Sequence, residues 1–267
     1  MSPAAADPQE LLGLAVDLVR AAGDLARDGR AEALDDVSAK STPTDVVTAM
    51  DKAAEALVVE RLRAARPDDA VLGEEGGARG GGSGVRWLLD PIDGTVNYLY
   101  GIPQYSVSLA AEVDGVVVAG VVRNPVSGEE YTAVRGGGAW RAGRRLAGSG
   151  KDELATALVG TGFGYSAADR AAQGAVVARL LPMVRDIRRF GSAALDLCYV
   201  AEGRLDAYFE KNLNPWDAAA GGLIAEEAGL LVTGLRGAPP SHEMTLAAGP
   251  ALHGALHDLL VSLLDRT

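Results

Sequence analysis

The stretch Asp-Pro-Ile-Asp-Gly-Thr at residues 90–95 is the segment of the sequence that says most about fold and chemistry. It follows the apolar run Val85–Leu89, which predicts a buried strand that ends at Asp90. Pro91 and Gly94 then favour a tight turn, because proline presets its own φ and glycine accepts a positive φ. The sequence therefore predicts a buried strand that delivers acidic residues to a turn at its carboxyl end.

The two acids of this turn are three residues apart, so one turn can aim both carboxylates at a single point. The carbonyl of Ile92, between Asp90 and Asp93, can add a neutral oxygen, and oxygen ligands are those that Mg²⁺ prefers. Gly94 and Thr95 offer backbone N–H groups that suit an anion at the start of the next short helix. The pattern indicates a divalent cation beside a phosphate, although Asp-Pro-x-Asp-Gly is also ordinary turn chemistry.

Three acids elsewhere in the chain could join this turn, and each also has a simple structural explanation. Glu74 follows another apolar strand and precedes a glycine-rich segment. Asp217 begins a predicted helix, 217–228, where capping of that helix would explain it equally well. Asp51 lies in a predicted helix, 46–65, where a solvated acid on the helix face is the simpler interpretation. No single one of these acids indicates a functional site. Together with the acids of the turn, they predict one carboxylate cluster.

The composition restricts both ligand and partners. The 267 residues include 25 Lys and Arg against 36 Asp and Glu, a net charge of −11, so we expect no nucleic-acid partner. An acidic protein that binds an anion needs a local cation to reverse the field. The three histidines lie late in the chain and cysteine is single, which disfavours zinc and favours an oxygen-bound cation such as Mg²⁺, Mn²⁺ or Ca²⁺.

The same sequence shows no sign of export or membrane insertion. No apolar run approaches the roughly 20 residues that a membrane span needs, and the first residues lack the pattern of a secretory signal. Cys198 is the single cysteine, so it cannot form an internal disulfide and is compatible with a reducing compartment. We therefore expect a cytoplasmic protein with no membrane partner.

The remaining segments alternate between helical and strand patterns, which indicates a layered α/β protein of the α+β class. Residues 76–84, six of which are glycine, predict a flexible surface loop. The other predicted elements are helices at 8–28, 166–181, 192–202 and 250–265 and strands at 70–73, 105–112, 116–123, 130–134, around Trp140, 156–160, 186–190, 204–209, 229–233 and 244–248.

Taken together, these motifs resemble the inositol monophosphatase family of magnesium-dependent, lithium-sensitive sugar phosphatases. The resemblance runs from about residue 40 to 230 in the family's order, and the motifs are specific jointly rather than singly. The matching segments are Lys40–Thr48 with Asp51, Gly73–Glu75, Asp90–Asn97, Gly191–Ala194, Asp206–Glu210 and Trp216–Gly221, while Thr161–Ser166 and Ile187–Cys198 are most similar to the bacterial, actinobacterial-type branch.

This resemblance implies an αβαβα sandwich. Its N-terminal lobe, residues 1–155, would contain the β meander and the main metal-binding turn, and its C-terminal lobe, residues 156–267, would complete the site within one compact unit. Two or three Mg²⁺ ions, replaceable by Mn²⁺, would bind there. By similarity the ligands are Glu74, Asp90 and the Ile92 carbonyl for the first ion, and Asp90, Asp93 and Asp217 for the second.

The resemblance also implies roles in catalysis. A water molecule activated by the cations would attack phosphorus in line, with Asp51 and Thr95 orienting and deprotonating it and Glu74 at the same centre. The residues implied in substrate binding are Asp93, Gly94, Thr95, Ala193, Glu210 and Asp217.

Several of these residues keep a second interpretation. From the sequence alone Glu210 looks like a surface acid at a strand end. Lys40 could steer phosphate or order its own loop, or do neither. Arg188 and Arg189 could contact a leaving group or a second subunit, and a solvated strand edge is the simpler interpretation.

The implied activity is hydrolysis of myo-inositol monophosphate to inositol and phosphate by a cytoplasmic homodimer that lithium inhibits. A related phosphatase is the alternative, acting on fructose-1,6-bisphosphate, histidinol phosphate or 3′-phosphoadenosine 5′-phosphate. A second alternative is a regulatory interaction protein that keeps the fold. A calcium-binding module is disfavoured, because the amide-lined turn suits an anion and no EF-hand pattern is present.

Overall fold

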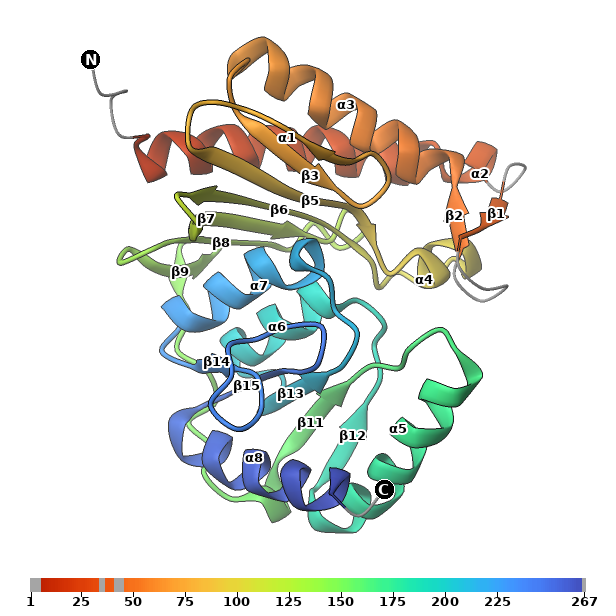
Figure 1. Cartoon of the computed structure of the whole chain (residues 1–267), viewed down its shortest axis with the longest axis vertical. Helices are drawn as coiled ribbons and strands as arrows, with labels where there is room; N and C mark the ends of the chain where they lie inside the picture. The colour runs from red at the N-terminus through yellow and green to blue at the C-terminus, as the bar shows by residue number, and fades with distance from the viewer. Residues whose placement is uncertain (1–5, 34–36, 41–45, 266–267) are drawn as a thin grey trace.

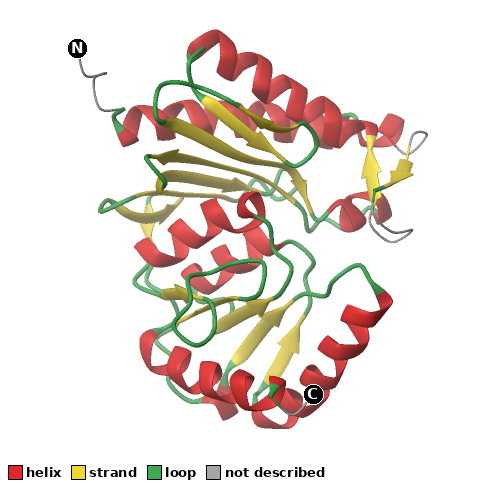
Figure 2. Ribbon diagram, viewed as in Figure 1, coloured by secondary structure: helices red, strands yellow, loops and turns green. Residues whose placement is uncertain are grey.

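The computed structural model describes residues 6–33, 37–40 and 46–265, and it arranges them in five layers (Figure 1). Figure 2 shows the order of these layers: two long helices, a sheet, two central helices, a second sheet, and two outer helices. The predicted αβαβα sandwich is confirmed. Among the described residues, no helix combines the length and the apolar character needed to cross a bilayer.

The first helical layer covers one face of the larger sheet. Helix α1 (Pro8–Asp28) begins where Asp7 accepts a hydrogen bond from the Gln9 amide at 2.9 Å, with proline in its first turn. Its apolar stripe is buried against the sheet and against α3 (Ala49–Ala65). Short elements at this end of the layer are α2 (Arg30–Ala33) and the ribbon of β1 (Val37–Ala39) with β2 (Val46–Thr48).

The larger sheet has eight strands and is antiparallel except where β3 runs parallel to β5. Its strands are β3 (Ala70–Gly73), β4 (Gly77–Arg79), β5 (Val85–Asp93), β6 (Ser106–Val113), β7 (Val116–Arg123), β8 (Glu130–Val134), β9 (Gly138–Arg141) and β10 (Arg144–Arg145). Their order across the sheet is β10-β9-β8-β7-β6-β5-β3-β4. β5 therefore lies inside the sheet, which explains why nearly all of its side chains are buried.

The central layer consists of α6 (Ala193–Glu202) and α7 (Pro215–Glu227), which lie between the two sheets. Every residue of α6 from Ala193 to Ala201 is buried. A helix that is buried on all sides needs apolar residues on all sides, which accounts for the run of small and apolar residues in both helices. This layer joins the largest hydrophobic cluster of the molecule.

The smaller sheet has the strand order β12-β11-β13-β15-β14, with β11 parallel to both of its neighbours. Helices α5 and α8 cover its outer face, and α4 follows β5 directly (Figure 1). The bounds of these elements are α4 (Thr95–Tyr100), β11 (Leu158–Thr161), α5 (Ala167–Leu180), β12 (Asp186–Arg188), β13 (Ala207–Glu210), β14 (Leu231–Thr233), β15 (Thr245–Ala248) and α8 (Pro250–Leu264), with single 3₁₀ turns at Leu154–Thr156 and Leu181–Met183.

Three predicted boundaries were wrong in ways that have a physical reason. The helix expected from residue 46 begins at Ala49, because β-branched Val46–Thr48 pairs with β1 and Thr48 then caps the helix. Within the glycine-rich segment, Gly77–Arg79 forms an edge strand beside β3 instead of remaining a loop. β5 does not end at Asp90 but continues to Asp93.

The larger sheet lies close to the central helix α7 at Gly120 of β7. A Cβ added there would lie 3.0 Å from the Cα of Ala220 in α7. We expect Gly120→Ala to lower the free energy of unfolding by about 1–3 kcal/mol, since backbone atoms of α7 would have to move. Gly174→Ala is the matched control, because a Cβ there meets nothing within 4 Å and alanine favours a helix. Equal stability of the two variants in urea unfolding would contradict the tight contact.

Candidate active site

The carboxyl end of β5 carries Asp90 and Asp93. The ladder between β5 and β6 is irregular between Asp90 and Asp93, so the strand bulges at this point. The Ile92 amide donates to the Asp90 carboxylate at 3.0 Å, which holds the bulge. Gly94 adopts φ 97°, and a Cβ there would lie 2.9 Å from the carbonyl oxygen of Gly191. Only glycine fits this position, where β5 passes into α4.

Asp93 is held by the amino end of α6. Its carboxylate accepts hydrogen bonds from the Ser192 hydroxyl at 2.5 Å and from the amides of Ala194 at 2.8 Å and Ala193 at 3.2 Å. Ser106 adds a longer contact at 3.4 Å. Burial raises the pKa of Asp93, and these donors act in the opposite direction by stabilising the carboxylate. The central helix therefore fixes the orientation of an acid that belongs to the larger sheet.

Four acids from three segments of the chain meet here: two at the end of β5, one after β3 and one in α7. Asp90 is 2% exposed, and it interacts electrostatically with Glu74, Asp93 and Asp217. Burial, and then the neighbouring carboxylates, raise the pKa of Asp90 well above its usual range. Burial also raises the pKa of Asp217 well above its usual range, with Asp93 as the next contribution. The four acids line one pocket together with Ile92, Gly94, Thr95, Ala193 and Glu210.

One interaction partly relieves this crowding of negative charge. Lys40 donates to Glu74 at 2.8 Å and also pairs with Glu75. Lys40 was expected to steer phosphate, to order its own loop or to do neither. The structure shows that it forms ion pairs at the rim of the site. Residues 41–45, which complete its sequence motif, lie outside the described residues.

Thr95 links the turn to the first helical layer. Its hydroxyl lies 3.1 Å from the Asp51 carboxylate and 3.1 Å from the Ile92 carbonyl. The second oxygen of Asp51 accepts from the amide of Thr48 at 2.9 Å and from its hydroxyl at 2.5 Å, which closes a capping box on α3. Burial raises the pKa of Asp51, and the Thr48 donors oppose that change. Asp51 is fully buried, so the interpretation as a solvated helix-face acid was wrong.

Glu210 approaches the same pocket from the end of β13. Its carboxylate accepts a hydrogen bond from the Tyr208 hydroxyl, and burial raises the pKa of Glu210 to about 7. Electrostatic interaction with Asp93 adds to the increase, whereas Arg189 opposes it. An acid in this environment differs from the ordinary strand-end surface acid that the sequence alone suggested.

The structure also corrects or completes other expectations. Asp217 is not the cap of its helix: α7 begins at Pro215 with Asn214 as cap, and Asp217 in the first turn accepts from the Asn214 amide at 2.6 Å. Arg188 pairs with Asp186 at 2.6 Å, away from the pocket, while Arg189 lines it.

Two residues that orient the site were missed in the sequence. Ser192 and Ser106 both reach Asp93, although one caps a helix and the other begins a strand far away in the chain. A serine at a helix start and a polar residue in an apolar strand were the available signals, but neither reveals its partner.

The chemistry of these donors fits hard divalent cations. The pocket presents carboxylate oxygens and a peptide carbonyl, and its described lining has no histidine or cysteine, which suits Mg²⁺ or Mn²⁺ better than zinc. Within the described ranges, no three acidic, histidine or cysteine side chains already form a complete metal-binding group. Lys40 occupies an oxygen of Glu74 that a cation would use.

The fold is thus a five-layered α/β sandwich in which the four acids, from three segments of the chain, line one pocket. The model of the inositol monophosphatase family matches residues 7–266, and the chain belongs to this family. The inositol-1-monophosphatase of Mycobacterium leprae is 47% identical over 94% of this chain and 93% of its own length. The Nus factor SuhB of Pseudomonas aeruginosa is 43% identical over 88% of each chain. The solved structure of Mycobacterium tuberculosis SuhB has 43% identity and a TM-score of 0.82, covering 96% of this chain and 98% of that one.

Proposed function

We propose that the protein is a magnesium-dependent phosphomonoesterase that hydrolyses myo-inositol monophosphate to inositol and phosphate. The observation that carries the proposal is the meeting of Glu74, Asp90, Asp93 and Asp217 in one pocket with the amide-bearing turn at Gly94. Family membership supports it, and so does the relative from Mycobacterium leprae that is named an inositol-1-monophosphatase.

The proposed ligands are Glu74, Asp90 and the Ile92 carbonyl for one cation and Asp90, Asp93 and Asp217 for another. When bound, two or three Mg²⁺ ions would neutralise the phosphate and lower the pKa of a water molecule. Groups of the protein itself would hold the phosphate and move the proton of the attacking water. The amides of Gly94 and Thr95 hold phosphate oxygens, and the Thr95 hydroxyl passes a proton from the attacking water to the nearer oxygen of Asp51.

The polyol would lie on the side of the pocket formed by the smaller sheet. Glu210 and the Ala193 backbone line this side and would accept or donate hydrogen bonds to ring hydroxyls. Asp93 and Asp217 face the same space. Because Tyr208 donates to Glu210, the carboxylate keeps one defined orientation toward the ring.

Phosphate release in Mg²⁺ buffer tests the proposed substrate. We expect kcat/KM for inositol-1-phosphate to exceed those for fructose-1,6-bisphosphate, histidinol phosphate and 3′-phosphoadenosine 5′-phosphate by about tenfold, because the pocket's hydroxyl-accepting groups would be left unpaired by a mismatched alcohol. A larger value for any of the other three esters would assign the chain to that related activity instead.

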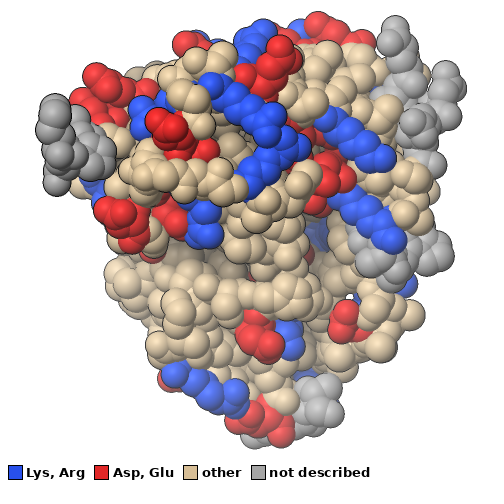
Figure 3. Space-filling view, turned by 45° about the horizontal axis from the view of Figure 1, so that its top comes forward, with Lys and Arg blue, Asp and Glu red and all other residues tan. Residues whose placement is uncertain are grey.

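A second candidate is a regulatory interaction protein that keeps the fold, which the relatives named Nus factor SuhB suggest. On the face drawn in Figure 3, Lys and Arg side chains gather in the upper half, where Asp and Glu side chains lie beside them. With the net charge of −11, this distribution favours the enzyme over direct nucleic-acid binding.

We further propose a homodimer formed through the surface around α4. Four apolar side chains of this surface are 37–75% exposed: Val96, Tyr100, Ile102 and Val126. The Asn124 side chain donates to the Pro103 carbonyl, and this hydrogen bond holds the segment of Val126 beside the segment of Ile102. We expect Tyr100→Glu to give a monomer in light scattering, because it places a charge in the apolar contact. Trp140→Glu, at an exposed aromatic residue on β9, should remain dimeric. A dimeric Tyr100→Glu would exclude this surface.

The lobes and the compartment are also proposals. The two sheets divide the chain near residue 155, with the larger sheet formed before it and the smaller sheet after it. The site would need both lobes, since Asp90 comes from one and Asp217 from the other. Cys198 is buried and free, which suits a reducing cytoplasm.

A further inference from the structure

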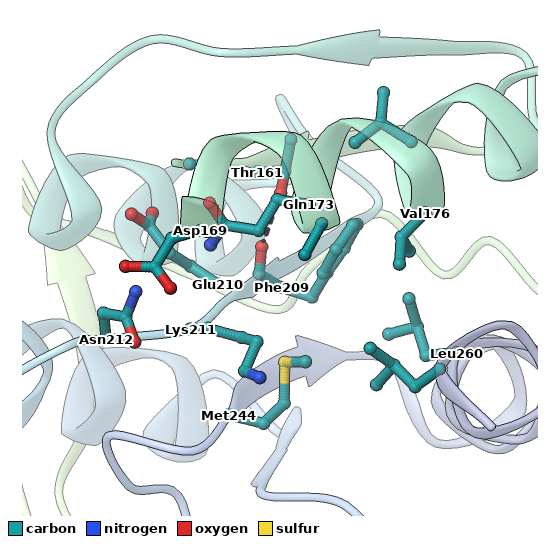
Figure 4. Close-up of a pocket in the computed structure, with 14 residues that line it drawn as sticks. Thr161, Asp169, Gln173, Val176, Phe209, Glu210, Lys211, Asn212, Met244 and Leu260 are labelled. Atoms are coloured by element: carbon teal, nitrogen blue, oxygen red, sulfur yellow. Dashed lines mark hydrogen bonds between the residues drawn. The ribbon is translucent and has the colours of Figure 1, made fainter. Parts of the chain in front are cut away.

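A second pocket lies beneath α5, where this helix faces α8 across the end of β13 (Figure 4). Its cavity volume is about 90 Å³, and it is partly open to solvent. Figure 4 shows that its two ends differ in chemistry: Asp169, Glu210 and Asn212 lie at one end, and Val176 and Leu260 at the other.

The apolar end is well formed. Phe209, Val176, Met244 and Leu260 line it and are all less than 7% exposed. Within α5 only Val176 and Leu180 are buried, so most of the helix does not pack into the core. The residues that α5 contributes to the pocket wall include Ala172, Val176 and Val177.

This pocket adjoins the candidate active site. Glu210, Lys211 and Asn212 line both pockets, so the segment that begins at the last residue of β13 lies between them. Glu210 is the residue proposed to face the alcohol of the substrate. A leaving group that extends past this segment would enter the polar end first and reach the apolar end beyond it.

We propose that the pocket beneath α5 is a leaving-group subsite for phosphomonoesters whose alcohol carries an apolar arm. The inference rests on the proposed phosphatase activity and extends its substrate class beyond polyols. Water adds across the P–O bond, inorganic phosphate leaves on one side, and the arm departs as the free alcohol with its proton. The polar end accepts the oxygen-bearing part of the alcohol, and Phe209, Val176 and Leu260 receive the hydrocarbon.

Two esters of matched reactivity test the subsite. Ethyl phosphate and n-hexyl phosphate release primary alcohols of similar acidity. The ratio of their kcat/KM values therefore measures how the longer alkyl chain binds and not a difference in leaving-group reactivity. We expect n-hexyl phosphate to be hydrolysed with a kcat/KM about tenfold or more higher, since each buried methylene adds apolar contact. Equal kcat/KM values for the two alkyl esters, with inositol-1-phosphate still hydrolysed, would overturn the proposed subsite but not the proposed phosphatase activity. Absence of hydrolysis with every ester would overturn the proposed function as well.

Variants of Val177 add a second, independent readout. Val177 lines the pocket from α5, so Val177→Phe should fill it and lower kcat/KM for n-hexyl phosphate about tenfold while inositol-1-phosphate changes less than about twofold. Val177→Ala should keep the preference for the longer ester. Ala178→Phe is the matched control, because Ala178 is the exposed neighbour on the same helix. An unchanged hexyl-to-ethyl ratio in a folded Val177→Phe protein would also overturn the inference.

Discussion

Replacing Asp90 with asparagine is expected to lower kcat/KM for inositol-1-phosphate by about 10³-fold or more. Asp90 is the one acid that both proposed cations share, and cation stabilisation of a phosphoryl transition state is worth several kcal/mol, with each 1.36 kcal/mol equal to a factor of ten. Its side chain is buried among Glu74, Asp93 and Asp217, so no water-exposed carboxylate can take its place. Steady-state phosphate release at saturating Mg²⁺ measures the effect.

Two controls separate lost cation binding from lost folding. Asparagine keeps the oxygen that accepts the Ile92 amide, and it removes one charge from a crowded cluster. The thermal unfolding temperature of chelated Asp90→Asn should therefore equal or exceed that of the chelated wild type. Asp152→Asn, at an exposed acid, should leave the rate unchanged. If Asp90→Asn retained more than about a tenth of wild-type activity, the proposed ligand set would be wrong.

The turn at residues 90–95 could be predicted because its chemistry is local. An apolar strand, a proline and a glycine determine where the acids point, and all of them lie within ten residues. The long helices were predicted for the same reason, since Asp7 caps α1 within the segment itself. The error at residues 46–48 arose because pairing with β1 overrode a helical pattern that continued smoothly into α3.

The environment of each acid could not be predicted, because burial is a property of the whole fold. Asp51 is fully buried and bonded to Thr95, and Glu210 lines the same pocket as Asp93, from which it is far in the sequence. Ser192 reaches Asp93 across 99 residues of chain. The family resemblance supplied the grouping of these residues, and the structure supplies the hydrogen bonds that hold them in place.

Asp51→Asn is expected to lower kcat for inositol-1-phosphate by about 10²- to 10⁴-fold with little change in KM, which is the usual range for loss of a general base. The carboxylate has two separate tasks. One oxygen of Asp51 accepts from the Thr95 hydroxyl, and this contact leads toward the proposed water. The other oxygen closes the capping box with Thr48. The variant would impair both tasks, so its loss of rate needs a comparison that removes only one.

Thr48→Ala provides that comparison. It removes the hydroxyl that caps α3 and leaves the contact between Asp51 and Thr95 in place. We expect it to cost about 1 kcal/mol of unfolding free energy, as loss of a cap does, and to keep kcat within a few-fold of wild type. Equal losses of kcat in the two variants would mean that Asp51 acts by positioning the start of α3. A loss confined to Asp51→Asn would mean that the proton passes from Thr95 to the Asp51 carboxylate, which is not one of the proposed cation ligands. The general base would then be separate from the carboxylates that must stay ionised to hold the cations.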